Sequence, residues 1–288
     1  MKNHTLTSVI SAILILFLIG GCLPETGPVR LALKFADGQN LTWSIQSKAL
    51  IREFENDSLV AYTESTERSF ATEQVLAILE DSSARIRRTN YYPSPDDNNP
   101  LYLTDSNVVS WSAEYTQSTG GQIRDYMPQD TVNAEILAYY QKIYDQVAPN
   151  YPDRPVTPGY SWSQSVRVAL PDGRVTTAAT RYKVRSFARV LGYDCAVIES
   201  QGTVLLPFAG TDQNAGSSIS GQSQKDISGI TYFAYKDGFI VRYEETYDSR
   251  LVGRRHKADD DNSFAVYEKG TYSYWLIETS ADNSVAIK

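Results

Sequence analysis

Trp43-Ser44 opens an extended segment of this sequence, and Arg68-Ser69-Phe70-Ala71 follows it. Trp162-Ser163 and Arg185-Ser186-Phe187-Ala188 repeat the two motifs in the same order and at almost the same spacing. An alternating Ala-x-Ile then follows in each case, at residues 84–86 and 196–198. Three matches in one order indicate an internal repeat. We therefore predict two copies of one β-rich unit.

The segments that begin at the two tryptophans alternate between apolar and polar residues. One carries Trp43, Ile45, Ala49 and Ile51 on a single face, and its counterpart carries Trp162, Val166, Val168 and Leu170. A period of two is typical of strands with one face on a core. The predicted fold is mainly β (α+β), with two related curved antiparallel sheets that each resemble a half-barrel.

One amphipathic helix is predicted between the two units, from Asp130 to Val147. Asp130 or Thr131 can cap its N-terminus, and Pro149 ends it. Its apolar stripe consists of Val132, Ile136, Leu137, Tyr140, Ile143 and Val147. The predicted organisation is a first β unit over 31–128, a linking helix over 129–150 and a second β unit over 151–288.

The first 21 residues have the pattern of a signal peptide. Lys2 precedes an apolar run, Val9 to Ile19, that is shorter than the roughly 20 residues a membrane-spanning helix needs. Ile19-Gly20-Gly21-Cys22 closes it and resembles a bacterial lipobox. The resemblance implies cleavage before Cys22 and acylation of that residue, including by palmitate. Residues 22–30 would then form a flexible tether, whereas an ordinary secretory cleavage would leave Cys22 unmodified.

The lipobox resemblance also implies a location in the cell envelope. Leu23 follows the cysteine where an Asp would favour retention at an inner membrane, which points to the outer membrane, facing the periplasm, if the organism has one. The formal charge of −7 disfavours nucleic acid as a partner. The expected partners are the membrane itself, through the lipid anchor, and an apolar small molecule or an envelope protein.

No residue set for nucleophilic, metal or cofactor chemistry is evident, so we predict no catalytic residues, metal or cofactor. His256 is the single histidine after the signal peptide and lies in a charged turn. Cys195 lies in an apolar strand without an activating base, which favours a buried structural thiol. Paired carboxylates stay open as an acid/base alternative. The candidates, all more typical of solvated positions, are Asp96-Asp97, Asp259 to Asp261 (also a weak calcium alternative) and Glu244-Glu245.

Trp43 and Trp162 are the candidate ligand-binding residues. At equivalent places in the repeat, each would either cap the core of its unit or line an apolar cavity. Tyrosine is common, at 20 residues, and suits a half-exposed sheet face whose hydroxyl groups reach water.

Two longer patterns extend the comparison with known families. One begins at Leu31-x-Leu33-x-Phe35 and continues through Gly38-Gln39 to Trp43; the other runs from Pro155-Val156 through Pro158-Gly159 to Trp162. Together they resemble a loose group of uncharacterised bacterial lipoproteins with duplicated, half-barrel-like β units. That resemblance implies a shape and supplies no catalytic residues.

These observations predict a membrane-anchored envelope lipoprotein that binds or scaffolds and is not an enzyme. Its ligand would be an apolar molecule or a partner protein. The alternative from a different class is a carbohydrate-binding module, or a glycan-acting enzyme that uses carboxylates.

Overall fold

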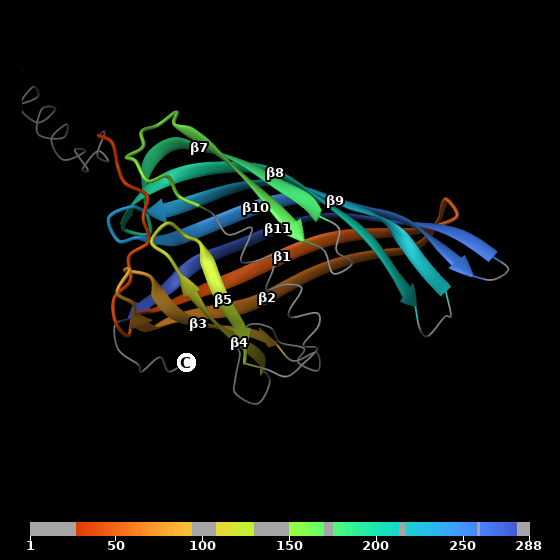
Figure 1. Ribbon diagram of the computed structural model, residues 1–288, viewed down its shortest axis with the longest axis horizontal. Helices are drawn as coiled ribbons and strands as arrows, with labels where there is room; N and C mark the ends of the chain where they lie inside the picture. Colours follow the sequence, from red (N-terminus) through yellow and green to blue (C-terminus); the bar gives the residue numbers. More distant parts are fainter. Residues whose placement is uncertain are drawn as a thin grey trace, which may run out of the picture.

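The computed structural model describes residues 27–93, 108–129, 150–169, 175–212, 217–257 and 260–280. Within these ranges the chain forms one antiparallel sheet of eleven strands, in the order β5-β4-β3-β2-β1-β11-β10-β9-β8-β7-β6. The strands are β1 (Asn40–Glu55), β2 (Ser58–Ile78), β3 (Ala84–Pro93), β4 (Val108–Gln117), β5 (Ile123–Pro128), β6 (Ser161–Ala169), β7 (Val175–Val190), β8 (Tyr193–Asp212), β9 (Ser217–Ala234), β10 (Phe239–Lys257) and β11 (Asp260–Ser280). Figure 1 shows a curved sheet whose central strands extend well beyond the edge strands.

The prediction of a mainly β fold is confirmed, but that of two sheets is wrong. β1 pairs with β11 along its length, from Asn40 opposite Ser280 to Glu55 opposite Phe264, and this ladder joins the two halves of the chain. The pairing links residues more than 200 positions apart, so local alternation could not reveal it. The predicted helix, Asp130 to Val147, lies outside the described residues, as do Cys22 and the predicted signal peptide.

The two tryptophan motifs do not occupy equivalent positions in the sheet. Trp43 lies opposite Ala71, the last residue of the first Arg-Ser-Phe-Ala motif. Trp162 lies opposite Tyr182, six residues before the corresponding Ala188. In addition, β1 is central whereas β6 is an edge strand. The strand register therefore gives no support to the predicted duplication.

A segment ahead of β1 closes one end of the curved sheet. Val29 forms an antiparallel bridge with Val156, whose segment leads into β6. Leu33 N donates to Thr119 O in the β4–β5 turn at 2.8 Å, and Lys34 N donates to Gly238 O in the β9–β10 turn at 3.1 Å. These bonds tie together parts of the sheet that are far apart in strand order. The result is a half-barrel with one closed end, on the left in Figure 1.

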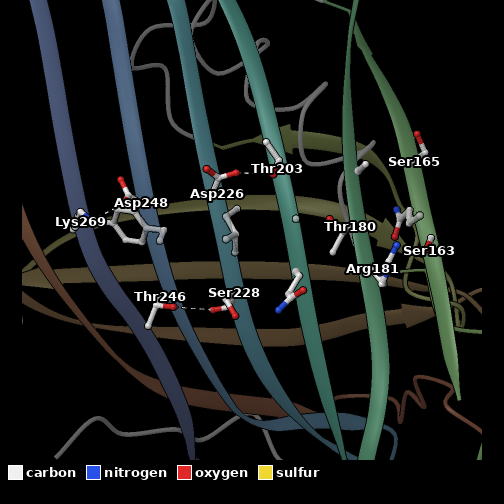
Figure 2. Close-up of a pocket in the computed structure, with 16 residues that line it drawn as sticks. Ser163, Ser165, Thr180, Arg181, Thr203, Asp226, Ser228, Thr246, Asp248 and Lys269 are labelled. Carbon is white, nitrogen blue, oxygen red and sulfur yellow. Dashed lines mark hydrogen bonds and ion pairs between the residues drawn. The ribbon is translucent and has the colours of Figure 1, made fainter. Parts of the chain in front are cut away.

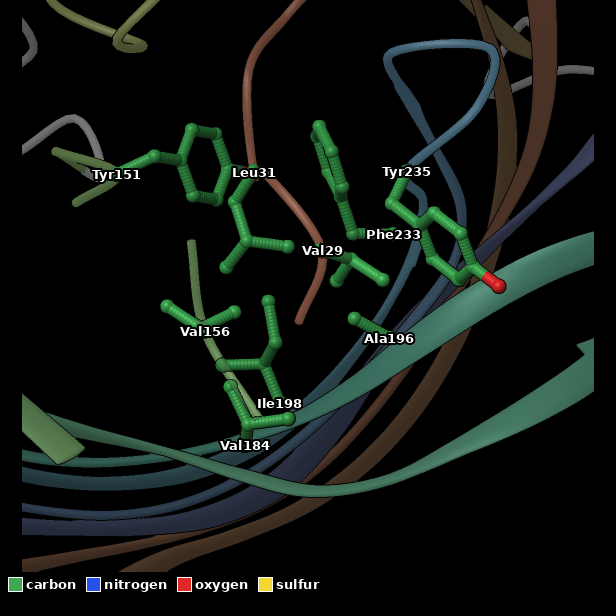
Figure 3. Packing of buried hydrophobic residues seen from close by; sticks show 9 residues of the cluster. All are labelled: Val29, Leu31, Tyr151, Val156, Val184, Ala196, Ile198, Phe233 and Tyr235. Carbon is green, nitrogen blue, oxygen red and sulfur yellow. The ribbon is translucent and has the colours of Figure 1, made fainter. Parts of the chain in front are cut away.

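The main core fills the concave side at the closed end. Figure 3 shows Val29 and Leu31 from the closing segment above Val184 and Ile198 of the sheet. Its buried members are Val29, Leu31, Tyr151, Val156, Val184, Ala196, Ile198, Phe233 and Tyr235. Burying a side chain such as Leu31 or Phe233 contributes roughly 1.5–3 kcal/mol. The closing segment is thus held by packing as well as by its hydrogen bonds.

Two smaller clusters continue the apolar packing near the same end. One contains Trp43 and Cys195, and the other contains Val75, Ile86 and Tyr115. Cys195 is fully buried, as predicted for a structural thiol. Burial raises the pKa of this thiol to about 12, which keeps it protonated.

Three long hairpins reach the opposite end of the molecule, on the right in Figure 1: β1–β2, β8–β9 and β10–β11. Asn56 and Asp57 adopt positive φ in the first turn, and Asn56 Nδ2 donates to Asn262 Oδ1 at 2.8 Å. The Gly, Ser, Gln and Asn content of residues 210–229 predicts a mobile loop, and for the described part of that range this prediction is wrong. β8 and β9 pair from Cys195 opposite Ala234 to Asp212 opposite Ser217. Polar strands persist there because cross-strand pairing satisfies their backbone.

The sequence predicts tight turns at Gly192 and at Asp237-Gly238, and both turns are present at the closed end. Gly192 follows β7 with φ 88°, and Gly238 has φ 79° between β9 and β10. A Cβ at Gly238 would lie 2.4 Å from Lys34 N, so the close approach of the closing segment needs glycine there.

Candidate functional site

The inner face of the sheet is the face that carries Val184 and Ile198 and lies under the closing segment. Directly paired residues share a face, so the register identifies the rest of it. A row of directly paired residues crosses the sheet two residues beyond the core positions Val184 and Ile198. It consists of Trp162, Tyr182, Ser200, Gly229, Glu245, Tyr272 and Ser47. In the far half of β9, the inner side chains Lys225 and Ile227 are half-buried while Gln224 and Asp226 on the outer face are exposed.

Tyrosines form a belt across the inner face beside the core. The centroid of the Tyr243 ring lies 5.2 Å from that of Tyr274 and 6.4 Å from that of Tyr272. Burial raises the pKa of Tyr151, Tyr243 and Tyr274. These phenols therefore stay neutral and present hydroxyl groups able to donate or accept hydrogen bonds.

Beyond the belt, tyrosines and glutamates pair along the inner face. Tyr243 Oη donates to Glu245 Oε2 at 2.5 Å, and Tyr247 Oη donates to Glu268 Oε1 at 2.6 Å. Lys225 Nζ lies 3.5 Å from Glu245 Oε1 and 4.2 Å from the centroid of the Tyr247 ring. The carboxylates are thus already engaged by phenols and an ammonium group.

A second polar cluster lies on the inner side of β2 and β3. Arg88 Nη1 donates to Glu73 Oε1 at 2.9 Å, and Tyr115 Oη donates to the same oxygen at 2.9 Å. Burial alone would lower the pKa of Arg88, but Glu73 and the nearby Tyr115, Tyr272 and Tyr274 raise it overall. The guanidinium is therefore permanently charged and is balanced by one carboxylate.

Asn90 adjoins this cluster and is left partly unsatisfied. Arg88 Nε donates to Asn90 Oδ1 at 3.4 Å, whereas Asn90 Nδ2 is buried and has no hydrogen-bond partner among the described residues. Asn90 itself is 5% exposed, and 33% of the Arg88 side chain remains accessible. An orphaned buried donor costs free energy, so it marks a place where an acceptor would be stabilised.

The far half of the inner face is a largely apolar floor. The half-buried apolar residues that we call the floor are Ile51, Val166, Val204, Ile227, Leu251, Phe264 and Val266. Polar neighbours such as Ser249 and Glu268 lie between them. No described helix or strand packs over this floor. Within the described chain it is consequently an apolar surface without a partner element.

Two aromatic rings of the inner face pack over glycines on the adjacent strand. A Cβ at Gly270 would come within 2.5 Å of Tyr247 Cζ, and one at Gly253 within 2.6 Å of Phe264 Cζ. Rings that cover glycine in this way restore the packing that the missing side chain would have supplied.

The two predicted tryptophans lie in different environments. Trp43 is 5% exposed and donates Nε1 to Ile240 O at 3.1 Å, so it is part of the core. Trp162 is half-buried and stacks on Tyr182 with ring centroids 5.0 Å apart and planes at 16°. The structure therefore does not bring the two together, and only Trp162 has substantial surface to offer a ligand.

Trp162 lines a groove of about 860 Å³ between the two edges of the sheet at the closed end. The groove runs from the β4–β5 turn at Gly120 to the start of β6, and Tyr160 extends the aromatic stack at 6.0 Å from Trp162. Trp162 Nε1 is engaged by Asn150 O at 3.1 Å. The groove thus offers aromatic faces with polar groups around them.

A second depression, of about 730 Å³, lies on the outer face. Figure 2 shows its Ser, Thr and charged side chains spread across β6 to β11. Thr203 Oγ1 donates to Asp226 Oδ1 at 2.6 Å, and Lys269 Nζ lies 2.7 Å from Asp248 Oδ2. These are exposed pairs spread over a broad, open surface, and they do not converge on a common point.

The predicted carboxylate candidates are dispersed. Glu244 and Glu245 lie on opposite faces as expected; Glu244 pairs with Arg242 on the outer face, and Glu245 belongs to the inner network. His256 is exposed near the far end of β10, and Asp96-Asp97 lie outside the described residues. Among the described residues, no group of three or more His, Cys, Asp or Glu side chains is placed to hold a metal ion.

Sequence reasoning missed the Glu73–Arg88–Asn90 cluster and the position of the tyrosine belt. The high tyrosine content was the available signal, but the members of the belt come from β7, β10, β11 and other distant segments. Their meeting depends on strand order, which the sequence did not reveal.

Comparison with known proteins yields likeness of shape alone. No family model matches the sequence, and no curated protein matches it. A protein inferred to be exported, with a YmcC-like fold, from Bacteroides fragilis superposes with a TM-score of 0.35 at 12% identity, covering 87% of this chain and 99% of that chain. An inferred lipoprotein from Parabacteroides distasonis gives a TM-score of 0.27 at 11% identity, covering 88% and 100%. Among the described residues, no helix has the length and hydropathy needed to cross a membrane.

Proposed function

We propose that this chain is a lipid-anchored protein of the bacterial envelope whose inner face binds an apolar molecule carrying an acyl chain. The observation that carries the proposal is the floor. It is a half-buried apolar surface on the inner face of the curved sheet, and the closing segment covers the other end of that face. An extended chain lying on it would remove apolar area from water, which contributes about 25 cal/mol per Å².

The proposed anchor rests on the N-terminal sequence. A signal-peptide pattern that ends in Ile19-Gly20-Gly21-Cys22 supports acylation of Cys22 and export to the envelope. The described chain begins its fold near Val29, at the closed end. The residues between Cys22 and Val29 would thus tether the closed end to the membrane and leave the three hairpins distant from it.

The inner face supports binding rather than catalysis. Its tyrosines are neutral, and Glu73, Glu245 and Glu268 each accept a hydrogen bond from a tyrosine. A general acid or base needs a group poised to exchange a proton with a substrate. These three carboxylates are instead held in hydrogen bonds to tyrosines.

A matched pair of neighbouring substitutions tests the proposal. Ile227 belongs to the floor, and Ser228, the next residue of the same strand, lies on the outer face. We expect Ile227→Glu to weaken binding of a fluorescent long-chain acyl probe at least tenfold, because each 1.4 kcal/mol of lost apolar contact is a factor of ten. Ser228→Glu, which adds the same charge on the other face, should change affinity less than twofold. Equal effects of the two variants, or absence of binding to the unmodified protein, would refute the proposal; a co-purifying protein on the floor would favour a protein partner.

Carbohydrate binding at the edge groove is a second candidate function. It is favoured by the stack of Tyr160, Trp162 and Tyr182, since aromatic faces and surrounding hydrogen-bonding groups suit sugar rings. Trp162→Ala should abolish retention on a glycan array while leaving acyl-probe binding intact. Retention that persists in this variant would remove the groove as the carbohydrate site.

A further inference from the structure

We propose that the Glu73–Arg88–Asn90 cluster is the head-group site for the acyl ligand and that it selects an uncharged hydrogen-bond acceptor, such as an ester carbonyl, over a free carboxylate. This inference rests on the proposed function, because it assigns the polar end of the same ligand.

The cluster lies beyond the end of the floor that is nearer the closed end of the sheet. Tyr272 and Tyr274 are close enough to Arg88 to shift its pKa, and both lie on β11 with floor residues Val266 and Phe264. Tyr274 is ten residues from Phe264, which at about 3.3 Å per residue corresponds to about 33 Å. A chain that follows β11 along the floor therefore has room to extend, with its head beside Arg88.

The groups of the cluster that are available for further hydrogen bonds are mainly donors. Within the described part of the chain, Asn90 Nδ2 has no hydrogen-bond partner and Arg88 Nη2 makes no hydrogen bond. The phenol of Tyr274 adds a hydroxyl group that its raised pKa keeps protonated. A carbonyl oxygen, which accepts up to two hydrogen bonds, matches this set.

The charge balance argues against an anionic head. The Arg88 charge is already compensated by Glu73 at 2.9 Å, so the pair is neutral. A carboxylate placed beside Arg88 would be desolvated next to the Glu73 carboxylate without a second cation in contact. Burying an uncompensated charge is strongly unfavourable, whereas an ester carbonyl brings no charge.

Matched probes on the wild-type chain test the selection directly. At pH 8, methyl laurate should bind at least tenfold more tightly than laurate, which has the same chain and an ionised head. Glu73→Gln removes the compensating carboxylate and leaves Arg88 charged, so laurate should gain at least tenfold and approach or exceed the ester. Glu80→Gln, an identical change in the exposed β2–β3 turn, should leave both affinities unchanged.

Asn90→Leu provides a variant that keeps the ion pair intact. It removes the orphaned donor at similar volume, so ester affinity should fall while laurate affinity hardly changes. Equal binding of ester and acid to the wild-type chain would overturn the inference, as would a folded Glu73→Gln variant with unaltered preference. If both probes bind and Ile227→Glu weakens both, the proposed function stands even when the head-group selection fails. If neither probe binds, the proposed function and the head-group selection both fail.

Discussion

The ring of Tyr247 covers Gly270, its direct cross-strand partner on β11. A methyl group at residue 270 would lie 2.5 Å from Tyr247 Cζ and 2.5 Å from Lys48 O. Lys48 O is backbone and cannot rotate away. The contact therefore fixes both the register of the central strands and the position of the aromatic ring on the floor.

Gly270→Ala should destabilise the protein because the added carbon overpacks this contact. We expect a loss of about 1–3 kcal/mol in the free energy of unfolding, measured by urea denaturation. Gly27→Ala, at a glycine with open space around it, is the matched control and should be close to neutral. Equal stability of the two variants would show that Tyr247 does not pack on Gly270 as described.

Cys195 should be inert to thiol reagents in the folded protein. Burial raises its pKa to about 12, so at pH 8 roughly one thiol in ten thousand would be ionised. With Cys22 acylated, a maleimide should leave the native chain unlabelled and add one label after denaturation. Rapid labelling without denaturant would contradict the buried position.

Asp81 should titrate well below an ordinary aspartate. Hydrogen bonds from the Ser83 hydroxyl and backbone N–H, and from Arg124, lower its pKa to about 2. A depressed folded-state pKa means that this contribution to stability is present above the unfolded pKa near 4 and is lost as pH falls through about 2. NMR titration should give the low value, and Ser83→Ala should raise it. A pKa near 4 in the unmodified chain would contradict the geometry.

Cys22 should carry the lipid. Cells fed an alkyne analogue of palmitate should label the full-length chain, and Cys22→Ser should abolish the label and release the protein into the soluble fraction. Cys195→Ala, which changes the only other cysteine, should retain the label. A label that survives Cys22→Ser would show that the lipid is attached to another residue and would contradict this prediction.

The sequence indicated strands and turns well where the signal was local. Gly192 and Asp237-Gly238 predict turns because tight turns need residues that tolerate positive φ, and both glycines adopt it. Residues 210–229 have a Ser, Gly and Gln content that is typical of loops, yet their described part pairs as strands. The ladder to a partner strand, which keeps them extended, was invisible in composition.

The arrangement of the candidate site depended on pairing between distant segments. Glu73 and Arg88 lie on adjacent strands and meet across one register position, yet neither residue is unusual in its own stretch. The β1–β11 ladder brings Tyr272 and Tyr274 to the same inner face. Tyrosine abundance alone therefore indicated a half-exposed sheet face without locating the belt.

The central claim is that an acyl chain lies on the floor. The most direct test is photocrosslinking in the bacterial host with a fatty acid methyl ester that carries a diazirine near the methyl end of its acyl chain, followed by peptide mass spectrometry. The account predicts adducts on inner-face residues of β9, β10 and β11, at Ile227, Leu251 or Val266, and their loss in Ile227→Glu. Adducts confined to outward residues such as Gln224 and Arg250, or none at all in a correctly localised protein, would contradict it.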